Sequence, residues 1–286
     1  METWKRTVYI SLVCVFCTAF GVSQLAPILP LYFHDLGVQT PEAMSLWSGL
    51  ATGATYIIVC LAAPFWGRVA DKKGRKITLI RSSFGMALCN ILIAFQTTPE
   101  GVVLIRLVQG LVSGFYSASI TLIASESPIE RTGWALGLLA SANLAGSLIG
   151  PLLGGYIADT VGIRNDFIIV GALMGLAGVL ATIFIHENYV PQPNPEKLSI
   201  RKLKEQIPEF NSIVTLCVAS FIYAICIMSL QPVISVYIKG IVPSDTENLA
   251  FIAGAVFSAM GIAQLMSSSP LGKLVDKIGP RKVLVV

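Results

Sequence analysis

"GRVADKKGRK", residues 67–76, places six charged side chains in ten positions directly after a segment, 43–66, that contains no charge. A similar stretch, "GKLVDKIGPRK", returns at 272–282. The glycines and aspartates of the two copies keep one spacing of 205 residues: Gly67 and Gly272, Asp71 and Asp276, Gly74 and Gly279. Self-similarity at a fixed distance is typical of duplicated structural units. The chain is therefore predicted to consist of two related halves.

The composition predicts a membrane protein. Of the 286 residues 54% are hydrophobic and 13% charged, with a mean hydropathy of +0.74, whereas about one quarter of an ordinary soluble domain is charged. The net charge of +4 does not indicate nucleic-acid binding, because the basic residues separate apolar segments instead of forming a groove with aromatic partners. We expect the lipid bilayer to be the main partner of the surface.

The length of the apolar segments predicts membrane-spanning helices, because a helix needs about 20 apolar residues to cross the hydrocarbon core. Eight segments bounded by charges qualify: 7–33, 43–67, 77–98, 101–125, 132–158, 167–187, 210–238 and 248–272. A ninth begins at Val283, where the sequence stops. The first segment is too long for the apolar region of a signal peptide and is expected to remain as an uncleaved span.

Three parts follow from the order of these segments. Residues 1–187 are predicted to form a six-helix bundle, and 210–286 an incomplete second bundle with two helices and the start of a third. Between them, 188–209 is rich in proline and charge and is predicted to be a cytoplasmic linker. With the N-terminus inside, 17 of the 20 basic residues lie on the inner side, which fits the bias of lysine and arginine toward the cytoplasm.

The loop at 67–76 combines a tight turn with a paired charge. Gly67 and Gly74 are expected to permit the turn between two helices, and Asp71 is an acid among cations, which we expect to be paired. A basic loop that only sets the topology is the alternative explanation. The pattern resembles motif A of the major facilitator superfamily, which implies a latch on the cytoplasmic side formed by Asp71 and Arg75, with Lys76 in the same motif. The second copy, with Gly272, Asp276, Gly279 and Arg281, has Pro280 in place of that arginine.

Two further motifs resemble the same family. Arg106 lies well inside a predicted span and is followed by Gln109 and Gly110, a pattern similar to motif B, which implies a part in proton transfer. Snorkelling of Arg106 to the interface is the alternative. In "GSLIGPLLGG", residues 146–155, the pattern of motif C is formed by Gly146, Gly150, Pro151, Gly154 and Gly155. Close helix packing explains part of this pattern, and its resemblance implies an antiporter. Gly254, Ser258 and Gly261 form a small-residue face that is predicted to contact it from the other half.

The first span carries "GVSQLAPILP", which is similar to the helix 1 signature of drug:proton antiporters, and "GIRNDF" follows the fifth span. The resemblance covers the whole chain and implies the twelve-helix major facilitator fold, of which eight helices and the start of a ninth are present. It also implies alternating access, exchange of protons for amphiphilic small molecules, a location in the plasma or inner membrane, and a monomer for the full-length protein. Family geometry places a substrate cavity near Gln24, Tyr32, Phe115, Tyr116, Asn143, Tyr223, Met228 and Gln231.

One gap in this prediction concerns the proton. No Asp or Glu lies in the middle of a predicted span, because Asp35 and Asp159 lie at outer ends. The proton-carrying acid is therefore either Asp35 or a residue beyond this sequence.

The sequence leaves some other functions open and disfavours others. A metabolite or sugar carrier of the same fold stays open, although motif C disfavours it, and so does a truncated, non-transporting membrane protein. An enzyme is disfavoured because His34 and His186 lie on opposite sides of the membrane and no nucleophile triad or phosphate loop is present. We expect no metal and no cofactor. All six cysteines lie in apolar segments, where a thiol behaves as a small hydrophobic group.

Overall fold

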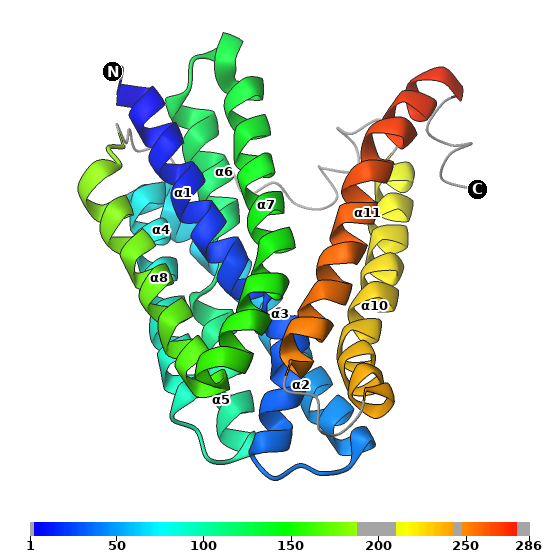
Figure 1. Ribbon diagram of the computed structural model, residues 1–286. Coiled ribbons are helices and arrows are strands. Elements are labelled where there is room, and N and C mark those ends of the chain that lie inside the picture. Colours follow the sequence, from blue (N-terminus) through cyan, green and yellow to red (C-terminus); the bar gives the residue numbers. More distant parts are fainter. Residues whose placement is uncertain (1–2, 188–209, 243–247, 279–286) are drawn as a thin grey trace.

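The computed structural model describes residues 3–187, 210–242 and 248–278. All regular structure in these ranges is helical (Figure 1). The helices are α1 (Thr3–Ser23), α2 (Leu25–Asp35), α3 (Pro41–Lys73), α4 (Arg75–Ala94), α5 (Pro99–Val112), α6 (Phe115–Glu126), α7 (Ile129–Val161), α8 (Ile163–Phe184), α10 (Phe210–Ile241) and α11 (Leu249–Ile278).

The described residues contain eight helical segments that are long and apolar enough to cross a membrane, which confirms the eight predicted spans. Two of the spans are interrupted, which the sequence analysis did not predict in this form. The first is interrupted at Gln24, between α1 and α2 and three residues before Pro27, although Gln24 keeps helical dihedral angles (φ −64°, ψ −21°). The fourth breaks at Ser113 and Gly114, between α5 and α6, where Gly114 has a φ of +114°.

Local chemistry determines where several helices begin. Thr40 and Thr98 precede the prolines that open α3 and α5, and their hydroxyls accept hydrogen bonds from Ala43 N at 3.4 Å and Gly101 N at 3.3 Å. A threonine cap followed by proline at the first helical position suits an N-terminus whose N–H groups lack partners. Two connections consist of one glycine each, because Gly74 joins α3 to α4 and Gly162 joins α7 to α8.

Helices α1–α8 form one bundle, and α10 and α11 stand together beside it (Figure 1). We call the end that holds the N-terminus and Gly74 the proximal end, and the opposite end, which holds Gly162, the distal end. Figure 1 shows α10 and α11 close to the bundle at the distal end and apart from it at the proximal end. Within the bundle, α1 packs on α7, α4 on α8 and α3 on α5.

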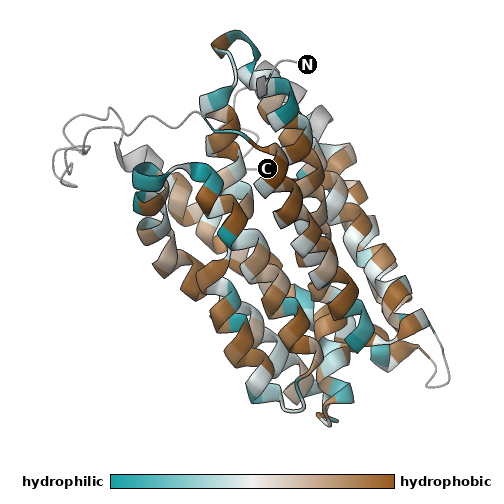
Figure 2. Ribbon diagram, turned by 90° about the vertical axis from the view of Figure 1, so that its left-hand side faces the viewer, coloured by the Kyte–Doolittle hydropathy of each residue, from teal (hydrophilic) through white to brown (hydrophobic). Residues whose placement is uncertain are grey.

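The core and the surface are both apolar. Phe115, Leu122 and Leu139 are fully buried in one cluster, and Ile28 and Phe33 in another. Many large apolar side chains face outward, for example Leu61, which is 71% exposed, and Leu104, which is 63% exposed. In Figure 2, hydrophobic residues run along most of each helix and strongly hydrophilic residues gather mainly near helix ends. Such a surface fits a hydrocarbon environment.

Candidate functional site

The motif A loop is a single turn at Gly74. Its φ is +92°, and the residue ends α3 and opens α4. The carboxylate of Glu187 accepts hydrogen bonds from the backbone N–H groups of Arg75 at 2.7 Å and Lys76 at 2.8 Å. A carboxylate is favoured at a helix N-terminus, because the N–H groups there lack partners and the helix dipole is positive. A Cβ on residue 74 would lie 2.7 Å from Glu187 Oε2, so that flexible carboxylate would have to shift, and the positive φ is what makes the position require glycine.

The predicted role of Gly67 in this loop is wrong, whereas the latch of Asp71 and Arg75 stays a prediction. Gly67 lies inside α3, has no positive φ, and has nothing within 4 Å of a Cβ built on it, so its predicted role in the turn is wrong. Asp71 lies in the last turn of α3 and Arg75 opens α4, so the two predicted latch residues flank Gly74. In the second copy, Gly279 and Arg281 lie outside the described residues. Of Gly272 and Asp276 the structure describes only the helical backbone of α11.

The motif B residues form a close contact between α5 and α3. Arg106 is buried, and its Nη1 donates to Gln109 Oε1 at 2.7 Å. The Thr55 hydroxyl donates to the Arg106 carbonyl at 3.0 Å, and a Cβ on Gly110 would lie 2.5 Å from the Thr55 carbonyl oxygen. Arg106 Nε has no hydrogen-bond partner, and no carboxylate bonds to this guanidinium among the described residues. Burial excludes the snorkelling alternative in this conformation.

A second embedded arginine closes the break in the fourth span. The side chain of Arg81 reaches from α4 to the junction of α5 and α6. Its two terminal nitrogens donate to the carbonyls of Leu111 at 3.1 Å and Ser113 at 3.0 Å. The guanidinium lies 3.5 Å from the ring centroid of Trp66, whose Nε1 also donates to the Leu111 carbonyl, at 2.7 Å. Arg81 thus satisfies the carbonyls that the end of α5 leaves without partners.

Arg81→Lys should lower the thermal unfolding temperature of the purified protein in detergent. A lysine keeps the charge but not the planar fork that bonds two carbonyls and stacks on an indole. The lost hydrogen bond and stacking correspond to about 2 kcal/mol. Arg68→Lys, on an exposed position of α3, is the matched control. Equal unfolding temperatures for the two variants would contradict this role of Arg81.

The glycines of motif C bring α7 against α1. A Cβ on Gly146 would lie 2.6 Å from the Phe16 carbonyl oxygen, and one on Gly150 would lie 2.5 Å from that of Phe20. At Gly154 the side chain of Gln24 occupies the space. These three glycines follow one another at intervals of four residues and so share one helix face. The backbones of α1 and α7 can approach only because this face has no side chains.

The opposite side of α7 contacts α11, which confirms the predicted small-residue face on the second half. Cβ atoms built on Gly155 and Gly254 would collide with the carbonyl oxygens of Ala250 and Pro151, respectively. The Ser258 hydroxyl donates to the Leu148 carbonyl at 2.6 Å, and a Cβ on Gly261 would meet the Leu148 side chain. Motif C therefore serves two interfaces at once.

Asp159 strengthens the contact between the halves at the distal end. Its carboxylate oxygens accept hydrogen bonds from Ala250 N at 3.1 Å and Phe251 N at 2.7 Å. Ala250 and Phe251 lie in the first turn of α11, so an acid from α7 caps a helix of the other half. The sequence analysis placed Asp159 at an outer helix end but assigned it no partner.

The sequence analysis also missed an acid inside the bundle. Asp166 lies between two predicted spans in the sequence, but it belongs to the first turn of α8 and is fully buried. Its Oδ2 accepts a hydrogen bond from Gln24 Nε2 at 3.0 Å. The only sequence signal was its position one residue before the predicted sixth span.

The predicted cavity residues divide into two groups. Gln24, Tyr32 and Phe115 are buried within the bundle and do not line an open cavity in this conformation. Gln24 bonds to Asp166, the Tyr32 hydroxyl donates to the Ile93 carbonyl at 2.7 Å, and Phe115 belongs to the core. The remaining five are at least partly accessible: Tyr116, Asn143, Tyr223, Met228 and Gln231.

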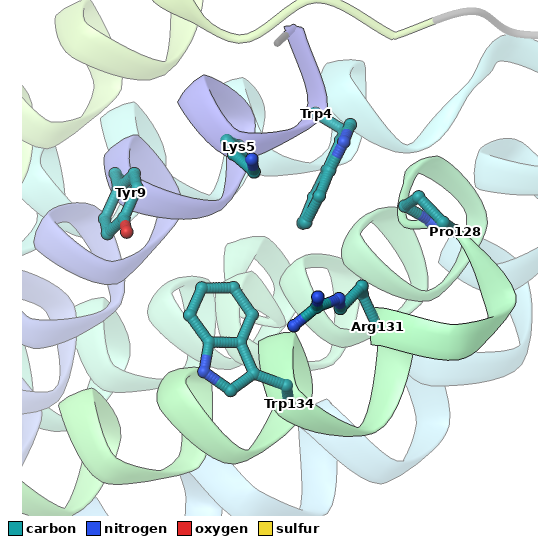
Figure 3. Close-up of a pocket in the computed structure, with 6 residues that line it drawn as sticks. All are labelled: Trp4, Lys5, Tyr9, Pro128, Arg131 and Trp134. Carbon is teal, nitrogen blue, oxygen red and sulfur yellow. The ribbon is translucent and has the colours of Figure 1, made fainter. Parts of the chain in front are cut away.

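A crevice of about 500 Å³ opens between α1 and the start of α7 at the proximal end (Figure 3). It is lined by Trp4, Lys5, Tyr9, Pro128, Arg131 and Trp134. The Trp4 and Trp134 rings meet edge to face at 6.4 Å, and Lys5 Nζ lies 5.5 Å from the Trp4 ring centroid. Tryptophan beside cations is typical of the interface between membrane and water. We therefore interpret the residues that line this crevice as anchors of the helix ends at the membrane surface.

Comparisons with known proteins agree with this architecture. Multidrug resistance protein MdtG of Proteus mirabilis (strain HI4320) is 37% identical over 284 residues, which cover 99% of this chain and 70% of the relative. MdtG of Dickeya zeae (strain Ech586) is 38% identical over 282 residues, which cover 99% of this chain and 69% of the relative. These relatives are therefore longer than the present chain.

Solved structures show the same fold at low sequence identity. A D-xylose-proton symporter matches with a TM-score of 0.63 and 16% identity, covering 96% of this chain and 68% of that chain. The POT family transporter PepTSo matches with a TM-score of 0.58 and 15% identity, covering 92% of this chain and 55% of that chain.

The family comparison extends over nearly the entire sequence. The model of the Major Facilitator Superfamily matches residues 11–286. Together with the eight spans and the relatives above, this match shows that the chain is a multi-pass membrane protein of a transporter family and not an enzyme. The chain belongs to the Major Facilitator Superfamily.

Proposed function

We propose that the full-length protein is a proton-coupled multidrug efflux antiporter that exports amphiphilic small molecules by alternating access. The observation that carries the proposal is 37% identity over 99% of the chain to a protein named for multidrug resistance. The glycine face of α7, which resembles motif C, supports the antiporter branch of the family. The likeness to a D-xylose-proton symporter concerns the fold alone and does not favour a sugar substrate.

The orientation belongs to this proposal. With the N-terminus in the cytoplasm, the proximal end faces inward and carries most of the basic residues, as the positive-inside rule requires. The distal end then faces outward, and the protein lies in the plasma or inner membrane.

In this orientation the described conformation is closed on the outside. On α10, residues 214–226 are all exposed, whereas Ser235 and Ile238, farther along, are buried. On α11, Ala250, Ala253 and Ser258 are buried, and 262–267 are exposed. Within the described ranges, the contacts between α7 and α11 extend from the distal end to Leu148 and Gly261. Alternating access would require these contacts to break and a proximal contact to form, where Asp71 and Arg75 are the proposed latch.

The proposal also assigns residues to the substrate and to proton coupling. The partly accessible residues Asn143, Tyr223, Met228 and Gln231 are the proposed substrate contacts, and Arg106 is proposed to act in proton coupling. Aromatic, flexible and uncharged polar groups suit amphiphilic molecules of varied shape.

The proposal predicts active efflux of a fluorescent amphiphilic dye. Cells that express the full-length protein should retain several-fold less dye than cells with an empty vector. A protonophore should abolish the difference, because it removes the proton gradient that drives export. Steady-state dye fluorescence per cell is the measurement. Normal membrane expression without any difference in dye content would refute drug efflux, and a difference that survives the protonophore would refute proton coupling.

A further inference from the structure

Gln24 and Asp166 form a polar pair inside an apolar bundle. They are 142 residues apart in sequence, both are fully buried, and Gln24 Nε2 donates to Asp166 Oδ2 at 3.0 Å. An ionised carboxylate in such surroundings is strongly disfavoured unless a cation or several donors stabilise it. One amide N–H is the only donor that the structure shows at this carboxyl group.

The pair of Gln24 and Asp166 is short of one hydrogen-bond donor. Asp166 Oδ1 and Gln24 Oε1 are both buried, and neither has a hydrogen-bond partner among the described residues. Both are acceptors when the acid is ionised, so they cannot bond to each other. A proton on Oδ1 would supply the missing donor. Gln24 Nε2–H then donates to Oδ2, and the protonated Oδ1 becomes a donor instead of an acceptor without a partner.

The surroundings hold the amide beside the acid. A Cβ on Gly154 would collide with Gln24 Oε1 and would lie 2.6 Å from its Cβ and 3.0 Å from its Cδ. The third glycine of motif C therefore provides the space that Gln24 occupies. Gln24 itself lies at the break between α1 and α2, where the Ile28 N to Gln24 O hydrogen bond is long, at 3.4 Å. A change in the hydrogen bond between Gln24 and Asp166 would therefore act directly on the junction of α1 and α2.

The other titratable groups near this level do not bond to the pair among the described residues. On the elements that pack around the pair they are Cys14, Cys17, Tyr32, His34, Asp35, Cys89, Tyr156, Asp159 and Arg164. The cation among them, Arg164, donates to the Gln96 carbonyl at 3.4 Å, and Asp159 caps α11. His34 and Asp35 lie 3.7 Å from each other. None of the nine bonds to the Asp166 carboxyl group among the described residues.

We propose that Asp166 is the proton-binding residue of this half, protonated while it is paired with Gln24 and deprotonated to water when the α1–α2 junction separates from α7. The inference rests on the proposed proton antiport and names the acid that the sequence analysis did not find. Because the proton binds one conformation more tightly than the other, a proton gradient shifts the balance between conformations.

The first test uses the full-length protein in proteoliposomes, with the dye of the efflux assay as substrate. Asp166→Asn should reduce transport driven by a pH gradient by roughly tenfold or more, while dye exchange without a gradient stays within about twofold of the wild type. Glu100→Gln, an exposed carboxylate on α5, is the matched control and should leave both rates unchanged. Asp35→Asn tests the rival acid. Gradient-driven transport that survives Asp166→Asn but is lost in Asp35→Asn would overturn the proposal.

The second test detects the proton on Asp166 directly. Infrared spectra of the protein with isotopically labelled aspartate should contain a band of a protonated aspartic acid that is absent in Asp166→Asn. If that variant does not fold, wild-type spectra still decide, because the absence of any such band would overturn the proposal. A wild-type protein without gradient-driven transport would instead refute the antiport function, and the band would still show whether Asp166 holds a proton.

Discussion

Gly150→Val should remove most of the folded protein from the membrane. The new Cβ would lie 2.5 Å from the Phe20 carbonyl oxygen and 3.1 Å from Phe20 Cα, and the Ser23 hydroxyl would also be in the way. Two of these three atoms belong to the backbone of α1 and cannot move without separating the helices. Overpacking of a core costs about 1–3 kcal/mol where side chains can shift, and we expect the upper end of that range or more here.

Gly137→Val is the matched control for this prediction. Gly137 lies on the same helix, and a Cβ there has nothing within 4 Å. Both variants place a β-branched residue in a helix, so the small loss of helix propensity cancels. The measurements are membrane yield and thermal unfolding in detergent. If Gly150→Val and Gly137→Val unfold at the same temperature, the contact between α1 and α7 does not depend on this glycine.

Asp159→Asn should shift the protein away from the distally closed conformation. The two carboxylate oxygens accept one backbone N–H each from the first turn of α11. An asparagine has one acceptor oxygen, and its NH₂ group would face an N–H donor. Hydrogen bonds to charged groups contribute about 1.5–3 kcal/mol, so the ratio of closed to open protein should fall by roughly tenfold to a hundredfold.

Spin labels can measure this shift. In a full-length protein without native cysteines, labels at Glu100 on α5 and Tyr237 on α10 report the separation of the halves near the distal end, and both positions are exposed. Asp159→Asn should move the distance distribution to longer values. Glu42→Gln removes another exposed distal carboxylate, one without a bond to α11 among the described residues, and should leave the distribution unchanged. Identical distributions for all three proteins would refute the role of Asp159.

The spans could be predicted from sequence because their signal is local. Length and hydropathy of a segment decide whether a helix crosses a bilayer, and eight such segments were found where the structure has them. The breaks at Gln24 and Gly114 were not predicted in this form, because they depend on neighbours. Arg81 reaches the α5–α6 junction only through the packing of α4. The predicted division at 188–209 lies outside the described residues and stays a prediction.

The site was predicted less completely than the spans, because its contacts also depend on residues that are distant in the sequence. The glycine spacing of 146–155 indicated close helix packing, and the structure shows this packing against α1, while the face with Gly254, Ser258 and Gly261 contacts the opposite side of α7. The partners of Glu187, Asp159 and Asp166 could not be predicted, because each contact joins segments at least 91 residues apart. Gln24 and Tyr32 were expected to face a cavity because they are polar groups in apolar helices. Burial among hydrogen-bond partners explains them equally well, and composition does not distinguish the two environments.

The two-sided packing of α7 limits how the halves can move. Gly146 and Gly150 hold α7 against the part of α1 that precedes Gln24, so these two segments are expected to travel as one rigid body, while the α1–α2 junction can separate from Gly154. In the contact with α11, the hydrogen bonds of Ser258 and Asp159 resist sliding along the axis of α7. This geometry leaves α11 free to rotate relative to α7. We therefore expect α11 to pivot on α7 near Gly254. A small rotation at the distal end would then produce a large displacement at the proximal end.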